Sequence, residues 1–316
     1  MSRNDPLSAV EPDLRAALAA MPNFNALTEE RLPAMRAILQ GEPALLGADG
    51  TLTVSRVFVS SRHGAADIPA LLYQPTVAVA VPLPALLNIH GGGFVAGSAH
   101  REDAAMRNIA KTLGCVVLST DYRLAPESPF PAAIEDCDSA LYWLHGAATE
   151  LCINVDRIAV RGVSAGGGLA LGLAVMARDR GGPPISFLQL IYPMLDDRTG
   201  EHPCTGKFVW TAAANRFGWD AVLRGQDRAS PPPYSVPGRA QDLASLPPIF
   251  LAVGAIDLFV GEILSLATRL VDAGVSLELH IYPGAYHGFS LVAESRAAKT
   301  LVRDSNAALS RAMHER

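Results

Sequence analysis

The chain carries a G-x-S-x-G pattern at residues 162–166, with Ser164 at its centre. The run before it, residues 157–160, reads as a buried strand, and the apolar run after it, residues 169–177, is typical of a helix. A serine on a sharp turn between strand and helix is exposed at the edge of a sheet, where its hydroxyl can attack a carbonyl carbon. The helix N-terminus that follows favours the negative charge which such an attack creates. A glycine-rich turn that happens to contain serine is the alternative interpretation.

A serine hydroxyl is a weak nucleophile, so it needs a general base, and the base needs an acid that orients it. In serine hydrolases with this turn, the acid and then the base follow the serine along the chain. His287 is the expected base, because it lies in a loop just past the last strand-like run, residues 277–282. The later histidines otherwise fall in an irregular segment (His202), inside that strand (His280) and near the end of the sequence (His314). An ordinary loop histidine is the alternative for the expected base.

Asp257 is the expected orienting acid, because it follows the strand-like run at residues 249–253 through a short turn. Two rivals stay open, since some hydrolases take the acid from the preceding strand end. These rivals are Asp196 and Asp197, which could equally form a surface ion pair with Arg198.

A second glycine-rich turn, His90-Gly91-Gly92-Gly93, follows another strand-like run. Attack on a carbonyl creates an oxyanion that preorganised donors must meet, and glycines let backbone N–H groups approach a ligand without a Cβ in the way. We therefore expect an oxyanion hole made by the N–H groups of Gly92, Gly93 and Ala165. We expect His90 and Gly91 to support this loop, His90 by hydrogen bonding. A phosphate-binding turn is the alternative, but no Lys-Ser or Lys-Thr pair follows as in a P-loop.

These turns must be positioned by an alternation of strands and helices that runs from residue 51 onward. Several strand-like runs are continuously apolar, as is typical of strands that are covered on both faces. The pattern predicts an α/β fold with a mostly parallel sheet of eight strands flanked by helices. The expected strands are 54–59, 69–73, 85–89, 115–118, 158–160, 187–191, 249–253 and 277–282, and the main expected helices are 101–113, 132–146, 165–180, 260–273 and 292–313.

Composition excludes several classes of protein. A formal charge of −5 offers no basic surface, so we expect no nucleic-acid partner. The four cysteines show neither disulfide nor zinc spacing, and we expect no metal and no cofactor. No run of 18 or more apolar residues is present, so no membrane span is expected. The first residues lack the pattern of a secretory signal, which favours a cytoplasmic location.

Four motifs together resemble those of the hormone-sensitive-lipase-like (bacterial family IV) esterases of the α/β-hydrolase fold. They are His-Gly-Gly-Gly-Phe at 90–94, Asp-Tyr-Arg-Leu-Ala-Pro-Glu at 121–127, Gly-Val-Ser-Ala-Gly-Gly at 162–167 and His-Gly-Phe at 287–289, and the resemblance covers about residues 55–312.

The resemblance implies an α/β-hydrolase fold and a metal-free carboxylesterase that acts on small-molecule esters, often with short to medium acyl chains. Ser164 would be the nucleophile, His287 the general base and then acid, and Asp257 the orienting acid. The family often dimerises through the last strand and the C-terminal helix, which implies a homodimer. The resemblance further implies a structural role for the charged side chains of the motif at 121–127, which are Asp121, Arg123 and Glu127.

We expect residues 1–48 to form an N-terminal helical cap segment, because this stretch reads as helices punctuated by prolines. Residues 49–316 would then be the catalytic domain. Residues 197–246 interrupt the alternation of strands and helices, and we expect this insertion to lie over the edge of the sheet and contribute to the cap.

The chain departs from the family pattern at three positions. Val163 stands where subgroups carry Thr or Asp, and Leu258 and Gly261 stand where the family often has Pro and Asp. A lipase and a small-molecule deacetylase or amidase are alternative functions, because the shape of the pocket separates them from an esterase. A non-catalytic ligand receptor is a remote alternative, disfavoured because the serine, the histidine and the acid are all present.

Overall fold

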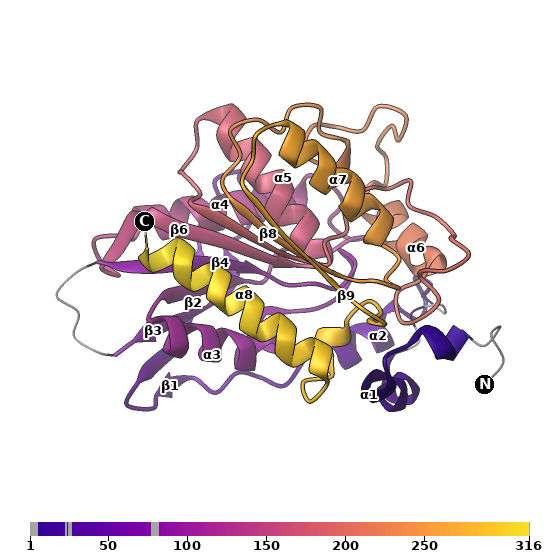
Figure 1. Ribbon diagram of the computed structural model, residues 1–316. Coiled ribbons are helices and arrows are strands. Elements are labelled where there is room, and N and C mark those ends of the chain that lie inside the picture. The colour runs from indigo at the N-terminus through magenta and orange to yellow at the C-terminus, as the bar shows by residue number, and fades with distance from the viewer. Residues whose placement is uncertain (1–5, 23, 25–26, 77–81, 316) are drawn as a thin grey trace.

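The computed structural model describes residues 6–22, 24, 27–76 and 82–315 of the chain, and Figure 1 traces them in sequence order. Its centre is one sheet with the strand order β1-β2-β3-β5-β4-β6-β7-β8-β9. The strands are β1 (Gly47–Ala48), β2 (Leu52–Val59), β3 (Ile68–Pro75), β4 (Leu83–Ile89), β5 (Val116–Thr120), β6 (Ile153–Val163), β7 (Phe187–Ile191), β8 (Ile249–Gly254) and β9 (Leu277–Tyr282).

The predicted mostly parallel sheet is confirmed, with one correction to its size. Neighbouring strands from β5 to β9 pair in parallel, whereas β1, β2 and β3 form an antiparallel entry to the sheet. Eight strands were expected and the sheet has nine. The additional strand is β1, whose two residues are both exposed and are too few to produce a hydrophobic pattern.

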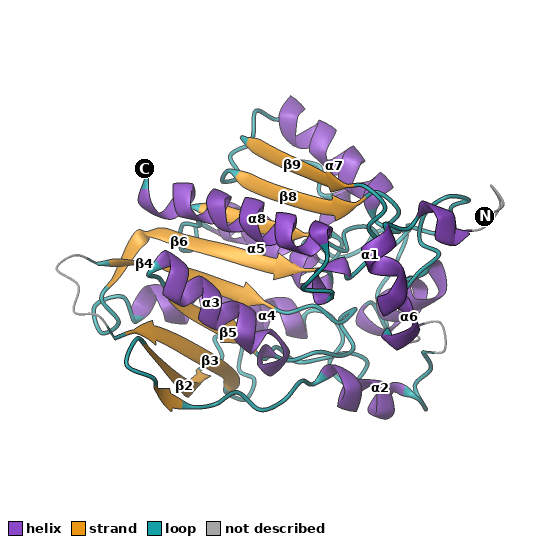
Figure 2. Cartoon of the chain, turned by 60° about the horizontal axis from the view of Figure 1, so that its bottom comes forward, coloured by secondary structure: helices purple, strands orange, loops and turns teal. Residues whose placement is uncertain are grey.

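Helices cover both faces of the sheet. Figure 2 shows α3 and α8 on one face and α4 and α5 behind it, while α7 packs against β8 and β9. The helices are α1 (Pro12–Arg15), α2 (Leu32–Leu39), α3 (Asp103–Leu113), α4 (Ala132–Gly146), α5 (Ala165–Arg180), α6 (Ala212–Val222), α7 (Val260–Asp272) and α8 (Arg296–His314). Short 3-10 turns are η1 (Pro6–Ala9), η2 (Ala16–Ala20), η4 (Ala99–Glu102), η5 (Pro237–Arg239) and η6 (Phe289–Leu291).

Two helices begin later than their sequence patterns indicate. We expected a helix from residue 101, but α3 starts at Asp103, because the residues before it form the 3-10 turn η4. We expected a helix from residue 292, but α8 starts at Arg296, because the side chain of Ser295 caps it by accepting a hydrogen bond from the N–H of Ala298 at 3.1 Å. Serine is among the residues that terminate helices most effectively in this way.

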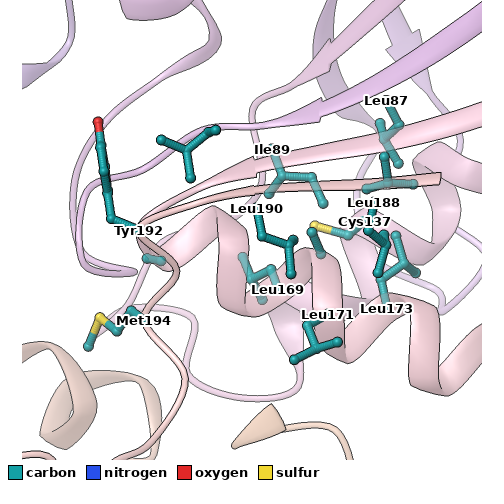
Figure 3. Packing of buried hydrophobic residues seen from close by; sticks show 14 of the residues in the cluster. Leu87, Ile89, Cys137, Leu169, Leu171, Leu173, Leu188, Leu190, Tyr192 and Met194 are labelled. Carbon is teal, nitrogen blue, oxygen red and sulfur yellow. The ribbon is translucent and has the colours of Figure 1, made fainter. Parts of the chain in front are cut away.

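The core lies between the central strands and the helices that cover them. Every residue of β7 and β8 is buried, which explains their nearly continuous apolar sequences, with Gln189 as the polar exception in β7. Figure 3 shows aliphatic side chains of β4 and β7 facing leucines of α5, with a cysteine of α4 beside them; the labelled residues of this group are Leu87, Ile89, Leu188, Leu190, Leu169, Leu171, Leu173 and Cys137. This packing fixes α5, and therefore the turn that precedes it, against the sheet.

The parallel strands all end at the same edge of the sheet, and the loops that follow them meet there. Figure 2 shows α1, α2 and α6 grouped beyond these strand ends. The N-terminal segment and the insertion therefore lie over the edge at which chemistry is expected. In the described part of the chain, no helix combines the length and the apolar character that a bilayer crossing requires.

Candidate active site

Ser164 occupies a strained turn between β6 and α5. Its backbone has φ 54° and ψ −118°, a conformation that costs a non-glycine residue about 1–3 kcal/mol. Neighbouring backbone groups hold it there, because its N–H donates to Ile191 at 2.9 Å and its carbonyl accepts from Gly167 and Met194, both at 2.9 Å. The strain presents the hydroxyl at the edge of the sheet, as the sequence pattern predicts.

Three side chains from separate loops form one line of hydrogen bonds. Ser164 Oγ lies 2.9 Å from His287 Nε2, and His287 Nδ1 lies 2.9 Å from Asp257 Oδ2. The other carboxylate oxygen of Asp257 accepts the N–H of Phe259 at 3.0 Å. Because the buried carboxylate can only accept, the proton of the neutral imidazole belongs on Nδ1, and Nε2 is left to accept the serine proton. The three residues therefore have the geometry of a serine-hydrolase triad.

Aromatic rings enclose the imidazole of His287. Tyr192 and Phe259 meet it edge-on, with centroids 4.8 and 5.0 Å away, and Trp210 lies at 6.1 Å. Tyr192 follows β7 and points away from the leucine core in Figure 3. Its hydroxyl is hydrogen-bonded to Ser290, and burial raises the pKa of Tyr192 to about 12, so the phenol is neutral. Sequence reasoning missed this residue, which directly follows the expected strand 187–191.

The rival carboxylates have other partners. Asp196 forms an ion pair with Arg198 at 2.7 Å, and the buried Asp197 pairs with Arg228 at 3.1 Å. His287 takes Asp257 as its partner. Asp196 thus forms the ion pair with Arg198 that its sequence allowed, whereas Asp197 is buried and pairs with an arginine of the insertion instead.

The remaining histidines beyond the serine lie away from it. His280 Nε2 contacts Glu278 at 2.8 Å on the edge strand β9, and His314 Nε2 contacts the carbonyl of Leu113 at 2.9 Å. His202 is exposed in the insertion. The described residues include no group of three or more His, Cys, Asp and Glu side chains that could hold a metal ion.

The glycine-rich turn after β4 packs directly against the serine turn. A Cβ on Gly166 would lie 2.1 Å from the carbonyl oxygen of Ile89, and a Cβ on Gly91 would lie 3.0 Å from the carbonyl oxygen of Val163, the residue before Ser164. Larger residues would therefore push the two turns apart. The absence of these side chains brings backbone N–H groups close to the serine.

Three of these N–H groups are available to a ligand. Those of Gly92 and Gly93 donate to no residue that the structure describes. Ala165 is the first residue of α5, where a backbone N–H has no partner within the helix. The oxyanion hole made by these three N–H groups stays a prediction, with which their lack of protein partners is compatible.

His90 contacts this turn through Gly91 and packs against Tyr122. Its Nδ1 lies 2.8 Å from the carbonyl oxygen of Gly91, and its ring stacks on Tyr122 with centroids 4.3 Å apart. The hydroxyl of Tyr122 donates to the carbonyl of His90 at 3.0 Å. These contacts hold the imidazole of His90 against the turn, and the supporting role of His90 and Gly91 stays a prediction.

The charged residues of the motif at 121–127 also act as braces. Asp121 accepts the N–H of Ala99 at 2.6 Å. Glu127 pairs with Arg36 of α2 at 2.7 Å, and this ion pair lowers the pKa of Glu127 to about 2. Arg36 also donates to the carbonyl of Val95 at 2.7 Å, so α2 is fastened to the loop beside the oxyanion turn.

Ser164 opens into a cavity of about 120 Å³. The insertion contributes Trp210, whose ring packs against Phe24 of the N-terminal segment at 5.4 Å. Gly93, with φ +63°, leaves room for this ring, because a Cβ there would lie 2.2 Å from it. The wall also includes Leu39, Arg101, Glu102, Val209 and Leu291.

The parallel sheet and the Ser–His–Asp geometry at its edge define the class of α/β hydrolases. Comparison with known proteins agrees with this class. A family model described as alpha/beta hydrolase fold matches residues 86–291. The chain is 35% identical over 291 residues to "Esterase LipI" of Mycobacterium tuberculosis, covering 90% of this chain and 89% of that protein. It is 38% identical over 264 residues to "Carboxylesterase NlhH" of the same species, covering 79% and 80%.

A solved structure, "Bacterial Heroin Esterase", is similar to the whole chain. It superposes with a TM-score of 0.88 at 33% identity, covering 98% of this chain and all of that one. The chain belongs to the hormone-sensitive-lipase-like esterases of the α/β-hydrolase fold, and it is a carboxylic ester hydrolase.

Proposed function

We propose that the enzyme hydrolyses short- to medium-chain carboxylic esters through an acyl-enzyme formed on Ser164. The observation that carries this proposal is the line of two 2.9 Å hydrogen bonds from Asp257 through His287 to Ser164. His287 Nε2 takes the hydroxyl proton as the serine oxygen attacks the ester carbonyl. Asp257 holds the ring in orientation and stabilises the imidazolium that forms.

The attack converts the carbonyl oxygen into an oxyanion, which the N–H groups of Gly92, Gly93 and Ala165 receive. His287 then donates its proton to the leaving alcohol, and the bond to the alcohol oxygen breaks. A water molecule, deprotonated by the same imidazole, then attacks the acyl carbon. The imidazolium returns this proton to Ser164 Oγ as the bond between the acyl carbon and Oγ breaks, which releases the acid and restores the enzyme. The cycle needs no group beyond these residues and water.

The size of the cavity supports the preference for shorter acyl chains. About 120 Å³ is small beside the roughly 300–1,000 Å³ of sites for drug-sized ligands. Trp210 and Phe24 close one side of it. A long lipid chain would require these rings to move, which disfavours the alternative of a lipase.

We also propose that residues 1–48 and the insertion 197–246 form a cap over the catalytic domain, residues 49–316. The support is twofold: both segments line the cavity, through Phe24 and Trp210 among others, and Glu29 is ion-paired with Arg224 across them. The contacts between the two segments support treating them as one cap, which covers the cavity that contains Ser164.

A homodimer through β9 and α8 is a further proposal. It is supported by the position of β9 at the edge of the sheet and by Ile281, which is 41% exposed on it. An unpaired strand edge is a ready template for pairing with a second chain. Sedimentation equilibrium should give twice the monomer mass, and a monomer at high concentration would contradict the proposal. The cytoplasmic location stays a prediction.

The experiment that tests the function is a series of initial rates on p-nitrophenyl esters from acetate to palmitate. Ser164→Ala is the matched control, because it removes one oxygen atom and leaves the turn in place. We expect the highest rates at short or medium chains and no turnover by the variant. An optimum at palmitate would favour a lipase, and turnover of amides without turnover of esters would favour an amidase.

A further inference from the structure

Arg101 lies in the wall of the same cavity as Ser164, on the turn η4. Its backbone N–H donates to Ser98 Oγ at 3.4 Å. Its guanidinium, by contrast, forms neither a hydrogen bond nor an ion pair with any described residue of the chain. A cation that the fold leaves without a partner in a substrate cavity is available to a substrate.

The acidic side chains around this end of the cavity are already engaged. Glu102 pairs with Arg161 at 2.8 Å, and Asp103 pairs with Arg107 at 2.8 Å. Asp121 accepts a backbone N–H at 2.6 Å. The carboxylates of Glu102 and Asp103 are thus neutralised by other arginines, and none of these three acids pairs with the guanidinium of Arg101.

The remaining wall offers this cation little else to bind. It consists largely of glycine backbone and of apolar side chains such as Leu39 and Trp210. A partly buried charge without a partner costs free energy, which a ligand of opposite charge recovers on binding. Guanidinium presents its donors in a planar fork that matches the two oxygens of a carboxylate.

We propose that Arg101 is a specificity-determining residue that binds a carboxylate on the substrate, so that the enzyme prefers esters carrying a second, ionised carboxyl group. This inference rests on the proposed ester hydrolysis at Ser164, because it concerns the same cavity. The carboxylate can belong to the acyl part of the substrate, as in a monoester of a dicarboxylic acid, or to the alcohol part, as in an ester of a hydroxy acid.

Two matched pairs of substrates separate these arrangements. Monomethyl succinate and methyl 4-methylpentanoate differ in the acyl part, where an isopropyl group replaces the carboxylate. Acetoxyacetate and isobutyl acetate differ in the same way in the alcohol part. The values of kcat/KM are measured by proton release for the wild type, Arg101→Gln and Arg101→Lys. Arg56→Gln is the control, since Arg56 is exposed on β2, outside the cavity wall.

We expect the wild type to prefer the charged member of one pair by about tenfold or more, as a hydrogen-bonded ion pair provides. Arg101→Gln should lose this preference, so that its ratio of kcat/KM on the charged ester to kcat/KM on the neutral ester falls about tenfold or more below that of the wild type. Arg101→Lys should keep part of it, because lysine keeps the charge but not the planar fork. Added salt should weaken the preference in the wild type, and Arg56→Gln should behave as the wild type.

Equal ratios of charged to neutral turnover in the wild type and in Arg101→Gln would overturn the inference. So would a preference for the neutral member of both pairs. In either case the neutral esters are still hydrolysed and the proposed function stands. A wild type that hydrolyses no ester would instead overturn the proposed function, and this inference with it.

Discussion

Replacing Glu262 by glutamine should remove a pH dependence from the free energy of unfolding. Glu262 lies in the first turn of α7, and it keeps some exposure as a residue although its carboxyl group is buried. One carboxyl oxygen accepts the N–H of Leu195 at 2.8 Å, and the other is hydrogen-bonded to Thr199 of the insertion. Burial, followed by the nearby charges of Asp196 and Asp257, raises the pKa of Glu262 to about 8.

The sign and the size of this pH dependence of the free energy of unfolding follow from proton linkage. The pKa of Glu262 rises from 4.5 to about 8 on folding, so between these values the folded chain holds a proton that the unfolded chain has released. Stability therefore falls as pH rises through this window, by ~1.4 kcal/mol for each pH unit. Between pH 5 and pH 7 the loss amounts to about 3 kcal/mol. Glutamine is neutral throughout, and it can still accept from Leu195 and donate to Thr199.

The assay is urea unfolding of the wild type and Glu262→Gln, followed by circular dichroism from about pH 5 to pH 8. The variant should gain stability relative to the wild type as pH rises, because other titrating groups cancel in the difference. Glu294→Gln is the control, since Glu294 is exposed and its ion pair with Lys299 lowers its pKa, so it titrates below this window. A difference between wild type and Glu262→Gln that is the same at every pH would refute the reasoning.

Three further predictions concern the site and its braces. Asp257→Asn should lower kcat by about 10⁴-fold, as loss of the orienting acid does in serine proteases. Asp196→Asn should stay near the wild type in the same p-nitrophenyl ester assay. The reverse order would assign the orienting acid to the preceding strand end. Gly93→Ala places a Cβ 2.2 Å from the ring of Trp210. This substitution should therefore lower kcat/KM and destabilise the fold by ~1 kcal/mol or more. An unchanged melting temperature would contradict this prediction. Glu127 has its pKa lowered to about 2 by its arginine partner, so its stabilisation is complete above the ordinary value and disappears as pH falls toward 2; being exposed, it should contribute less than ~1 kcal/mol. Thermal melts of Glu127→Gln and wild type should therefore converge in acid and differ at neutral pH, and a gap that widens in acid would be inconsistent.

The sequence was a good guide wherever a long pattern repeats. Apolar runs without alternation correctly located the parallel strands, because strands covered on both faces have no polar side. The ends of these strands then had to meet at one edge, which explains how Ser164, Asp257 and His287 could be grouped although they are far apart in the chain. The strand β1 could not be found in this way, since two exposed residues carry no pattern.

Contacts between distant segments were beyond the reach of sequence patterns. The ring of Trp210 packs against that of Phe24, although the two residues are far apart in the sequence. Neither residue belongs to a periodic stretch that would indicate its partner. Glu262 reads in sequence as one more acid at the start of a helix, which is favourable on electrostatic grounds alone. Its hydrogen bonds with Leu195 and Thr199 depend on how the chain after β7 packs against α7. Such contacts require the three-dimensional arrangement.

The central claim is that the acyl group of the ester is transferred to the hydroxyl oxygen of Ser164. The most direct test is mass spectrometry of the enzyme after reaction with an ester-like phosphonate that leaves a stable adduct on an active serine. The account predicts a single adduct, on the peptide containing Ser164, and its loss in Ser164→Ala. An adduct on another residue, or full labelling of Ser164→Ala, would contradict the account.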